Sequence, residues 1–421
     1  MKREDLLSKI SDPSKVWDVV VIGGGATGLG VAVDAVTRGY SVALFEWEDF
    51  AKATSSRSTK LVHGGVRYLA QGDVSLVLEA LYERGLLQQN APHLVKNQSF
   101  LIPNYRYWDN FLYTVGLTIY DILAGRLSLG RSKYVSKKKT TSYLPTVRVD
   151  GLKGGVVYHD GQFDDSRLAV NLAQSCVENG GCPINRMKVT AILHGSDGRA
   201  RGVKVQDLMN GQEYEVKAKA VINATGIFVD SIMEMDVPTH EHMVKPSQGV
   251  HLVLDKSFLQ SDYAIMIPKT DDGRVLFAVP WHDKVVVGTT DTLREHPELE
   301  PQALESEIEF ILNTAGRYLT RKPQRSDVLS VFAGLRPLAA PKKEGKSTKE
   351  ISRSHKIFVS ENKLITITGG KWTTYRRMAE DTVDKAIELN LLEKKACVTK
   401  KFRIHGYQLN PDLNNHLYIY G

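Results

Sequence analysis

The chain has few cysteines and no long apolar run. Three cysteines occur in 421 residues, Cys176, Cys182 and Cys397, and their spacing matches neither a CxxC pair nor a set of zinc ligands. We therefore expect free thiols in a reducing compartment and no metal site. No hydrophobic stretch reaches the roughly 18 residues that a transmembrane helix needs. The first residues also lack the apolar core of a secretory signal, which favours a cytoplasmic setting.

The composition is that of an ordinary globular protein. The sequence is 42% hydrophobic and 24% charged, and 421 residues exceed the size that a single hydrophobic core usually serves, so we expect two domains. Lysine and arginine number 55 against 48 acidic residues, which gives a formal net charge of +7. A positive balance suits an anionic substrate, an anionic membrane surface or nucleic acid, and charge alone does not choose among them.

The first strong structural signal is a strand, a helix and a second strand. Residues 17–22 form a β-branched run of buried-strand length. A helix is expected from Ala26 to Arg38 with Gly39 closing it, and residues 41–46 form the second strand. Because the connection is a single helix, the two strands should be parallel, as in a doubly wound α/β fold.

A glycine-rich turn joins the first strand to this helix. Residues 23–28 read G-G-G-A-T-G and fit the dinucleotide-binding pattern G-x-G-x-x-G in its proper context. Gly23 permits the tight turn, Gly25 lets the backbone approach a pyrophosphate, and Gly28 allows close packing of helix and strand. Glu46 ends the second strand, where a carboxylate can accept hydrogen bonds from both ribose hydroxyls. These residues predict a dinucleotide but leave FAD and NAD both open.

Further along, the pattern changes from α/β to short strands. A helix is expected over 165–180, and alternation from residue 214 leads into a buried strand that ends at Gly226. Residues 245–291 contain short apolar strands separated by turns, which predicts an antiparallel sheet in a second domain. Residues 342–355 are polar and lysine-rich, and we expect an exposed loop. The expected strands of the second domain are 250–254, 264–267, 274–279 and 285–287.

Residues 54–68 carry a more specific signature. They read T-S-S-R-S-T-K-L-V-H-G-G-V-R-Y, and the chain here resembles the FAD-dependent glycerol-3-phosphate dehydrogenases of the aerobic type. Signatures of that family look like TSS-x-S-x-KL-x-HGG-x-RYL. The resemblance extends to about residue 395 through further motifs at 160–168, 223–226, 249–251, 288–292, 334–337 and 369–376.

The resemblance implies an amino-acid-oxidase-like flavoprotein with FAD as cofactor. Its FAD-binding domain would comprise 1–85, 151–232 and 340–395, and its substrate-binding domain 86–150 and 233–339. Family members usually continue into a further helical domain, so we expect 396–421 to be the residual start of one. This polar tail should be weakly ordered or lie against the surface.

The activity implied is oxidation of sn-glycerol 3-phosphate to dihydroxyacetone phosphate by hydride transfer to FAD, with electrons passed on to quinone. An oxidase that uses dioxygen, acting on glycerol 3-phosphate or on an amino acid or 2-hydroxy acid, stays open. A flavin-containing RNA-binding protein is disfavoured because the basic residues are scattered and lack stacking aromatics.

The resemblance also names the residues of the site. Arg67 and Arg336 would project into the substrate pocket, with Tyr68, His251 and Lys371 close by. His251 is our first choice for the base that removes the hydroxyl proton, although a satisfied core histidine is an alternative reading. Lys371 would stabilise negative charge near N1 of the reduced flavin. The predicted cofactor-binding residues are Gly23, Gly25, Ala26, Thr27, Gly28, Glu46, Thr54, Ser55, Ser56, Lys60, Leu61, His63, Gly64, Gly65, Val189, Ala224, Gly226, Gly334, Gly370, Lys371 and Thr373.

One segment suits a membrane surface. Residues 109–123 are apolar on most sides and a basic flank follows, which favours interfacial docking on anionic lipid, although domain packing explains the apolar part equally well. The protein would then be peripheral on the inner face of the cytoplasmic membrane. Whether it forms a homodimer stays open. The basic flank consists of Arg126, Arg131, Lys133, Lys137, Lys138 and Lys139.

Overall fold

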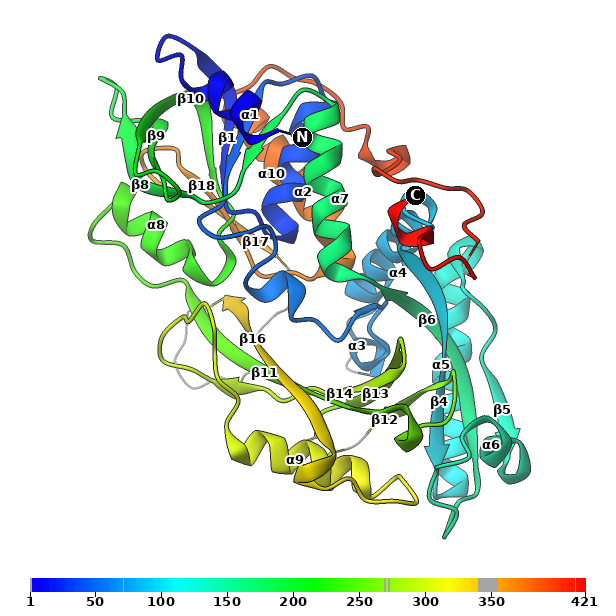
Figure 1. Ribbon diagram of the computed structural model, residues 1–421. Coiled ribbons are helices and arrows are strands. Elements are labelled where there is room, and N and C mark those ends of the chain that lie inside the picture. Colours follow the sequence, from blue (N-terminus) through cyan, green and yellow to red (C-terminus); the bar gives the residue numbers. More distant parts are fainter. Residues whose placement is uncertain (1, 71, 269, 272, 340–354, 413) are drawn as a thin grey trace.

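The computed structural model describes residues 2–421 except 71, 269, 272, 340–354 and 413, and except the side chains of Arg67 and Ala70. Two large sheets organise the described chain (Figure 1). The expected loop at 342–355 lies almost wholly outside the described residues.

The first sheet grows from the predicted βαβ unit. β1 (Val16–Ile22), α2 (Ala26–Thr37) and β2 (Val42–Phe45) follow one another, and the two strands are parallel. Gly39 has φ +82, the left-handed conformation expected just after the helix end. The strand order is β17-β18-β10-β1-β2-β7, with β9 pairing β10 and β8 pairing β9. The other strands are β7 (Cys182–Ile184), β8 (Met187–His194), β9 (Ala200–Asp207), β10 (Glu213–Asn223), β17 (Lys356–Val359) and β18 (Ile365–Thr368).

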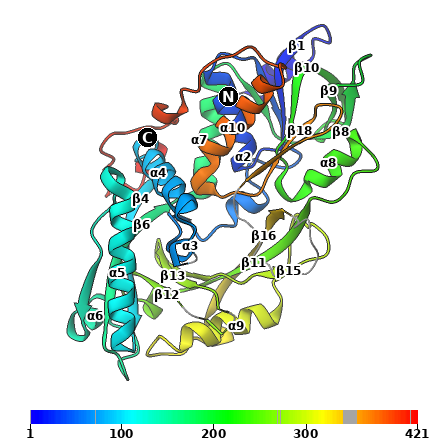
Figure 2. The ribbon, with the colours of Figure 1, turned by 180° about the vertical axis from the view of Figure 1, so that it is seen from behind.

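Both faces of this sheet are covered, which explains the unbroken apolar run in β1. Val19 and Val21 join a core with α2, α7 (Asp165–Glu178) and α10 (Tyr375–Glu388), which lie together on one face (Figures 1 and 2). Val20 and Ile22 face the opposite core, to which α1 (Arg3–Ile10) and α8 (Val229–Asp236) contribute. A strand buried on both faces needs no polar alternation.

The second sheet is antiparallel, as expected, apart from one parallel pairing between β4 and β12. Its long pair is β11 (Val244–Asp255) with β16 (Val328–Ala339). β3 and β6, from segments expected in the first domain, pair within this sheet. The remaining strands are β3 (Leu61–Val62), β4 (Val95–Asn104), β5 (Lys133–Ser136), β6 (Gly154–Phe163), β12 (Ala264–Ile267), β13 (Leu276–Trp281), β14 (Lys284–Gly288) and β15 (Thr292–Leu293).

Alternation along β11 decides which side chains face the first sheet. Val250, Leu252 and Leu254 pack into a core with Ile308 and Ile311 of α9 (Glu305–Gly316), on the side of the sheet remote from the first sheet (Figure 1). Because successive side chains of a strand point to opposite faces, Gly249 and His251 face the first sheet. The functional face of β11 is therefore the one between the two sheets.

Helices α3 to α6 lie near β4 and β6, at the end of the second sheet away from β11 and α9 (Figure 2). No helix of the described chain is long and apolar enough to cross a membrane. The tail lies against α4 and α7, where the backbone N–H of Ile404 donates to the carbonyl of Asn90 and Asn171 donates to the carbonyl of His405. The four helices are α3 (Val66–Ala70), α4 (Val74–Asn90), α5 (Tyr107–Ala124) and α6 (Lys137–Tyr143).

Candidate active site

The turn between β1 and α2 has the backbone shape of a phosphate cradle. Gly23 lies at φ +105, in the left-handed region that favours glycine. A Cβ at Gly28 would fall 1.9 Å from the carbonyl oxygen of Gly23, so the turn packs on the helix only without a side chain there. Among the described atoms, a Cβ at Gly25 would meet only Ser55 Oγ, at 3.1 Å, and would otherwise occupy open space at the helix N-terminus. Free N–H groups and the helix dipole make that space attractive to a pyrophosphate.

Glu46 stands beside this cradle at the end of β2. Its carboxylate accepts hydrogen bonds from the backbone N–H groups of Gly24, at 2.6 Å, and Glu48, at 2.8 Å. Burial raises the pKa of Glu46 above its ordinary value, and the two backbone donors oppose that rise. Val189 lies nearby in β8, two residues after Met187, whose N–H donates to the carbonyl of Glu46. The two backbone donors therefore hold the acid beside the cradle, and its contact with a ribose stays a prediction.

The segment that begins at Thr54 links the cradle to the second sheet. Ser55 Oγ accepts a hydrogen bond from the N–H of Ala26, and Thr54 donates to the carbonyl of Leu335 in β16. Lys60 Nζ lies 2.6 Å from a carboxylate oxygen of Asp165. The structure thus gives this lysine an internal partner, and a contact with the cofactor stays a prediction.

The glycine pair that follows is held from beneath by a buried network. Tyr120 of α5 accepts a hydrogen bond from the N–H of Gly64, at 2.8 Å, and its hydroxyl donates to Asp160, at 2.7 Å. Arg84 of α4 lies 2.8 Å from the other carboxylate oxygen of Asp160, and all three side chains are buried. Burial raises the pKa of Tyr120 well above its ordinary value, so the phenol stays protonated and can donate. The network therefore fixes the position of the Gly64-Gly65 backbone.

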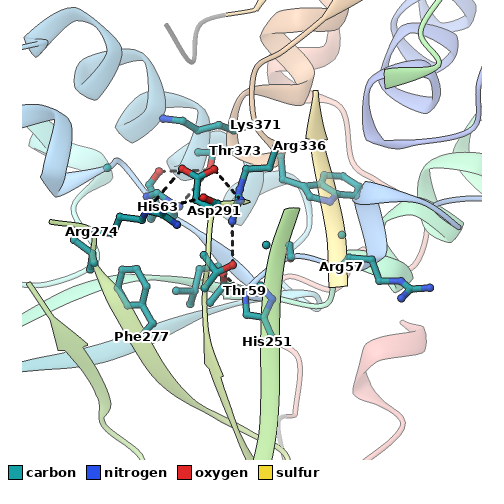
Figure 3. A pocket seen from close by; sticks show the side chains of 18 of the residues that line it. Arg57, Thr59, His63, His251, Arg274, Phe277, Asp291, Arg336, Lys371 and Thr373 are labelled. Carbon is teal, nitrogen blue, oxygen red and sulfur yellow. Dashed lines mark hydrogen bonds and ion pairs between the residues drawn. The ribbon is translucent and has the colours of Figure 1, made fainter. Parts of the chain in front are cut away.

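A cavity of about 310 Å³ lies between these loops and the second sheet (Figure 3). His251 lines it from β11, with Nε2 2.8 Å from Thr59 Oγ1 and its ring stacked on Phe332 at 4.8 Å between centroids. Burial, and then the positive charges of Arg336 and Lys60, lower the pKa of His251 to about 3. The imidazole is therefore neutral at physiological pH, with its orientation set by Thr59 and Phe332.

Cationic side chains line the same cavity. Arg336 of β16 donates from Nη2 to Thr289 Oγ1 and to the carbonyl of Thr290, both at 3.0 Å. A Cβ at Gly249 would lie 2.3 Å from Arg336 Nη2, so glycine at this point of β11 lets the guanidinium lie flat over the sheet. Lys371 Nζ lies 3.9 Å from the centroid of the Tyr68 ring. These contacts bring Arg336, Lys371 and Tyr68 to one cavity, and their roles toward a substrate stay predictions.

The loop at 369–373 closes the cavity. Gly369 and Gly370 have φ +79 and +74, and Thr373 Oγ1 accepts a hydrogen bond from the N–H of His63 at 3.2 Å. The indole of Trp372 donates to the carbonyl of Ser55 at 2.7 Å. Segments more than three hundred residues apart in the sequence are thereby joined.

The structure brings most of the predicted residues to two adjoining places. Arg67 belongs to α3, but its side chain lies outside the described part of the chain. Sequence reasoning missed Thr59, Arg274, Asp291 and Phe277, although residues 54–68 and 288–292 had both been singled out as motifs. Predicted residues at the cavity are Thr54, Leu61, His63, Gly65, Tyr68, His251, Gly334, Arg336, Gly370, Lys371 and Thr373. Those around the cradle are Gly23, Gly25, Ala26, Thr27, Gly28, Glu46, Ser55, Val189, Ala224 and Gly226.

Comparison with known proteins decides the family. Residues 18–376 match the model of the family described as FAD dependent oxidoreductase. The chain belongs to this FAD-dependent oxidoreductase family. Among curated relatives it is 43% identical to a mitochondrial glycerol-3-phosphate dehydrogenase of Schizosaccharomyces pombe, over 96% of this chain and 66% of that protein. It is 45% identical to one of Arabidopsis thaliana, over 94% of this chain and 64% of that protein.

A solved structure supports the same assignment. The glycerol-3-phosphate dehydrogenase of Bacillus halodurans, complexed with FAD, is 34% identical with a TM-score of 0.77, over 96% of this chain and 70% of that one. The chain thus spans about two thirds of the length of the relatives it matches. The FAD-binding, amino-acid-oxidase-like fold expected from sequence is confirmed, as is FAD as the cofactor.

The residues present fit FAD. Of the glycines in the cradle, Gly25 has an open approach, which is where a pyrophosphate needs backbone contact. Glu46 offers a buried carboxylate for a ribose, and the loops at 63–65 and 369–373 border the cavity next to His251. The cofactor would therefore extend from the cradle to the cavity between the sheets.

Proposed function

We propose that this chain oxidises sn-glycerol 3-phosphate to dihydroxyacetone phosphate and passes the electrons to a quinone. The observation that carries the proposal is the cavity beside the loops at 63–65 and 369–373. There a neutral, buried His251 faces Arg336 and Lys371. The similarity to proteins named glycerol-3-phosphate dehydrogenase supports the same substrate.

Each side chain then has a task in this reaction. Arg336 and Lys371 bind the phosphate dianion, for which a guanidinium and an ammonium are suitable donors. His251 accepts the proton of the C2 hydroxyl, because its lowered pKa leaves the ring unprotonated before substrate binds. Thr59 holds the ring by its contact with Nε2. When bound, FAD supplies the acceptor for the hydride that leaves C2.

Arg67 and Tyr68 extend this assignment. The resemblance implies that both contact the substrate, and the ring of Tyr68 lies beneath the Lys371 ammonium. We propose that Tyr68 orients Lys371 toward the substrate and that Arg67 adds a further cation. Lys371, next to two glycines and the start of α10, also suits charge stabilisation at the reduced flavin.

Anaerobic substrate reduction tests the activity. Purified holoprotein mixed with glycerol 3-phosphate should lose its oxidised-flavin absorbance, and glycerol at the same concentration should leave it unchanged. Unchanged absorbance with glycerol 3-phosphate would overturn the proposal, and bleaching by an amino acid or 2-hydroxy acid would favour the alternative oxidase. Stopped-flow reoxidation by a quinone analogue and by air then separates quinone from dioxygen as acceptor.

We also propose the domain division expected from sequence, with one adjustment. The first sheet and its helices would hold FAD, and the second sheet would bind substrate. β3 and β6 pair within the second sheet, so residues 61–62 and 154–163 belong structurally with the substrate side. Limited proteolysis with and without FAD would test the division, because the cofactor should protect the first sheet more strongly.

Peripheral membrane contact is proposed through α5. Its buried stripe consists of Asn110, Leu117, Tyr120 and Ala124, and the opposite face is exposed at Trp108, Phe111, Leu112, Val115, Ile119 and Ile122. Trp108 is 69% exposed and Ile122 is 71% exposed, so the outer face is strongly apolar. Exposed basic residues lie on β5 and α6, and β5 packs beside α5 (Figure 1). An apolar helix face beside cations suits the surface of an anionic bilayer.

Vesicle sedimentation tests this contact. The protein should pellet with phosphatidylglycerol vesicles and remain in the supernatant with phosphatidylcholine vesicles. Replacing Phe111 and Ile122 by serine should abolish pelleting, whereas Met209→Ser, which alters an equally exposed apolar side chain in a turn of the first sheet, should not. Equal pelleting of all three proteins would contradict the proposal. The relatives are named mitochondrial, so the membrane concerned could differ from the cytoplasmic one expected from sequence.

A further inference from the structure

We propose that Arg274 is a second phosphate-binding arginine, and that Asp291 holds it opposite Arg336 as one arm of a clamp. The proposal rests on the proposed oxidation of glycerol 3-phosphate and deepens it by naming the anion subsite. Arg274 lies just before β13, outside the motifs that carried the family resemblance.

The geometry places one carboxylate between two guanidinium groups. Arg274 Nη2 donates to the backbone carbonyl of Asp291 at 2.8 Å, and its Nε lies 3.9 Å from Asp291 Oδ2. Arg336 Nη1 lies 3.7 Å from Asp291 Oδ1. Figure 3 shows the two arginines approaching Asp291 from opposite sides of the cavity. Arg274 lies just before β13 and Arg336 lies in β16, and both contact Asp291.

Asp291 is itself fixed in place. It is buried, and the hydroxyl of Ser247 in β11 donates to its Oδ1. The neighbouring Thr289 and Thr290 accept hydrogen bonds from Arg336. The segment 289–291 therefore supports both guanidinium groups before substrate arrives, and a preorganised pair of donors loses little entropy when it binds an anion.

The charged residues that line the cavity suit an anionic group. Among the described lining residues, Arg57, Arg274, Arg336 and Lys371 are positive, and Asp160 and Asp291 are negative. This predominance of cations favours an anion such as the phosphate group of the proposed substrate.

A purely structural role for Arg274 is the competing explanation. In that case the guanidinium would serve only to neutralise Asp291, and its loss would lower folding stability and FAD content together. A phosphate-binding role predicts a different result. Substrate affinity should fall, while FAD content and the rate of the chemical step should stay nearly unchanged. Substrate kinetics and inhibition by inorganic phosphate separate the two roles.

The test uses three arginine variants of the holoprotein. Arg274→Ala should raise the KM for glycerol 3-phosphate and the inhibition constant for inorganic phosphate by about 30-fold each, the loss expected for a charge-assisted hydrogen bond. The value of kcat should change much less. Arg274→Lys should recover part of the loss, since it keeps the charge but not the fork. Arg317→Ala is the matched control, because Arg317 pairs with Asp271 on the exposed surface.

The outcomes are distinct. Wild-type KM and phosphate inhibition in Arg274→Ala would overturn this inference while leaving the proposed oxidation standing. If wild-type protein does not oxidise glycerol 3-phosphate at all, the proposed function itself fails. Should the alanine variant lose FAD, Arg274→Lys decides: full FAD content with a raised KM supports the clamp, and full FAD content with wild-type KM refutes it.

Discussion

Lowering the pH should destabilise the folded chain through His251. The pKa of this residue is lowered to about 3 in the folded protein, against about 6.5 for an exposed histidine. The unfolded chain therefore binds the proton more readily, so stability is fully present above pH 6.5 and is lost as pH falls from 6.5 toward 3. At about pH 5 the histidine is protonated in the unfolded chain but not in the folded one. The free energy of unfolding is then lower by about 2 kcal/mol, because each pH unit below 6.5 lowers it by about 1.4 kcal/mol.

A comparison with His251→Gln isolates this cost. Glutamine cannot take up the proton, so the free energy of unfolding of the variant should fall less between about pH 7.5 and about pH 5. The difference in free energy of unfolding between variant and wild type should change by about 2 kcal/mol over this range. Buried His93, whose pKa is lowered to about 4, contributes equally to both proteins and cancels. Denaturant unfolding of FAD-saturated protein at the two pH values measures the effect. Parallel pH dependence in both proteins would refute the reasoning.

Three further substitutions test the cofactor and substrate sites. Gly25→Val should yield flavin-free protein, because the branched side chain enters the pyrophosphate space. Arg336→Ala should keep FAD but lower kcat/KM for glycerol 3-phosphate by at least about 2 kcal/mol, with Arg336→Lys restoring only part. Tyr120→Phe should weaken FAD binding and lower stability by about 1–3 kcal/mol, because the N–H of Gly64 and a buried oxygen of Asp160 lose their partner.

Each substitution has its own control. Gly116→Val changes a glycine whose Cβ would meet nothing within 4 Å, and it should keep its flavin. Full FAD occupancy in Gly25→Val would end the assignment of the cradle. For Arg336→Ala the contrary result is wild-type kinetics, and for Tyr120→Phe it is an unchanged melting temperature together with an unchanged Kd for FAD.

Local patterns in the sequence were enough to predict the nucleotide-binding half of the molecule. Residues 17–22 and 41–46 are runs that only a doubly covered strand tolerates, and the structure places them as β1 and β2. The glycines at 23–28 permit backbone conformations that other residues rarely adopt, so their turn is encoded within a few residues. Arg336 was identified through the family resemblance of the short motif at 334–337. These inferences depend on interactions between near neighbours in the chain.

What only the tertiary structure decided is which distant side chains meet. No sequence pattern indicates that Tyr120 meets Asp160 and Gly64. In the structure these residues form one buried network next to the loop at 63–65. Arg274 lies just before β13 and Asp291 lies between β14 and β15, and their approach depends on how the second sheet pairs and on which face α9 covers. The outward face of α5 was equally ambiguous, because an apolar helix can pack inside or face outward. Such choices follow from minimising exposed apolar surface over the whole chain, a quantity that no short segment determines.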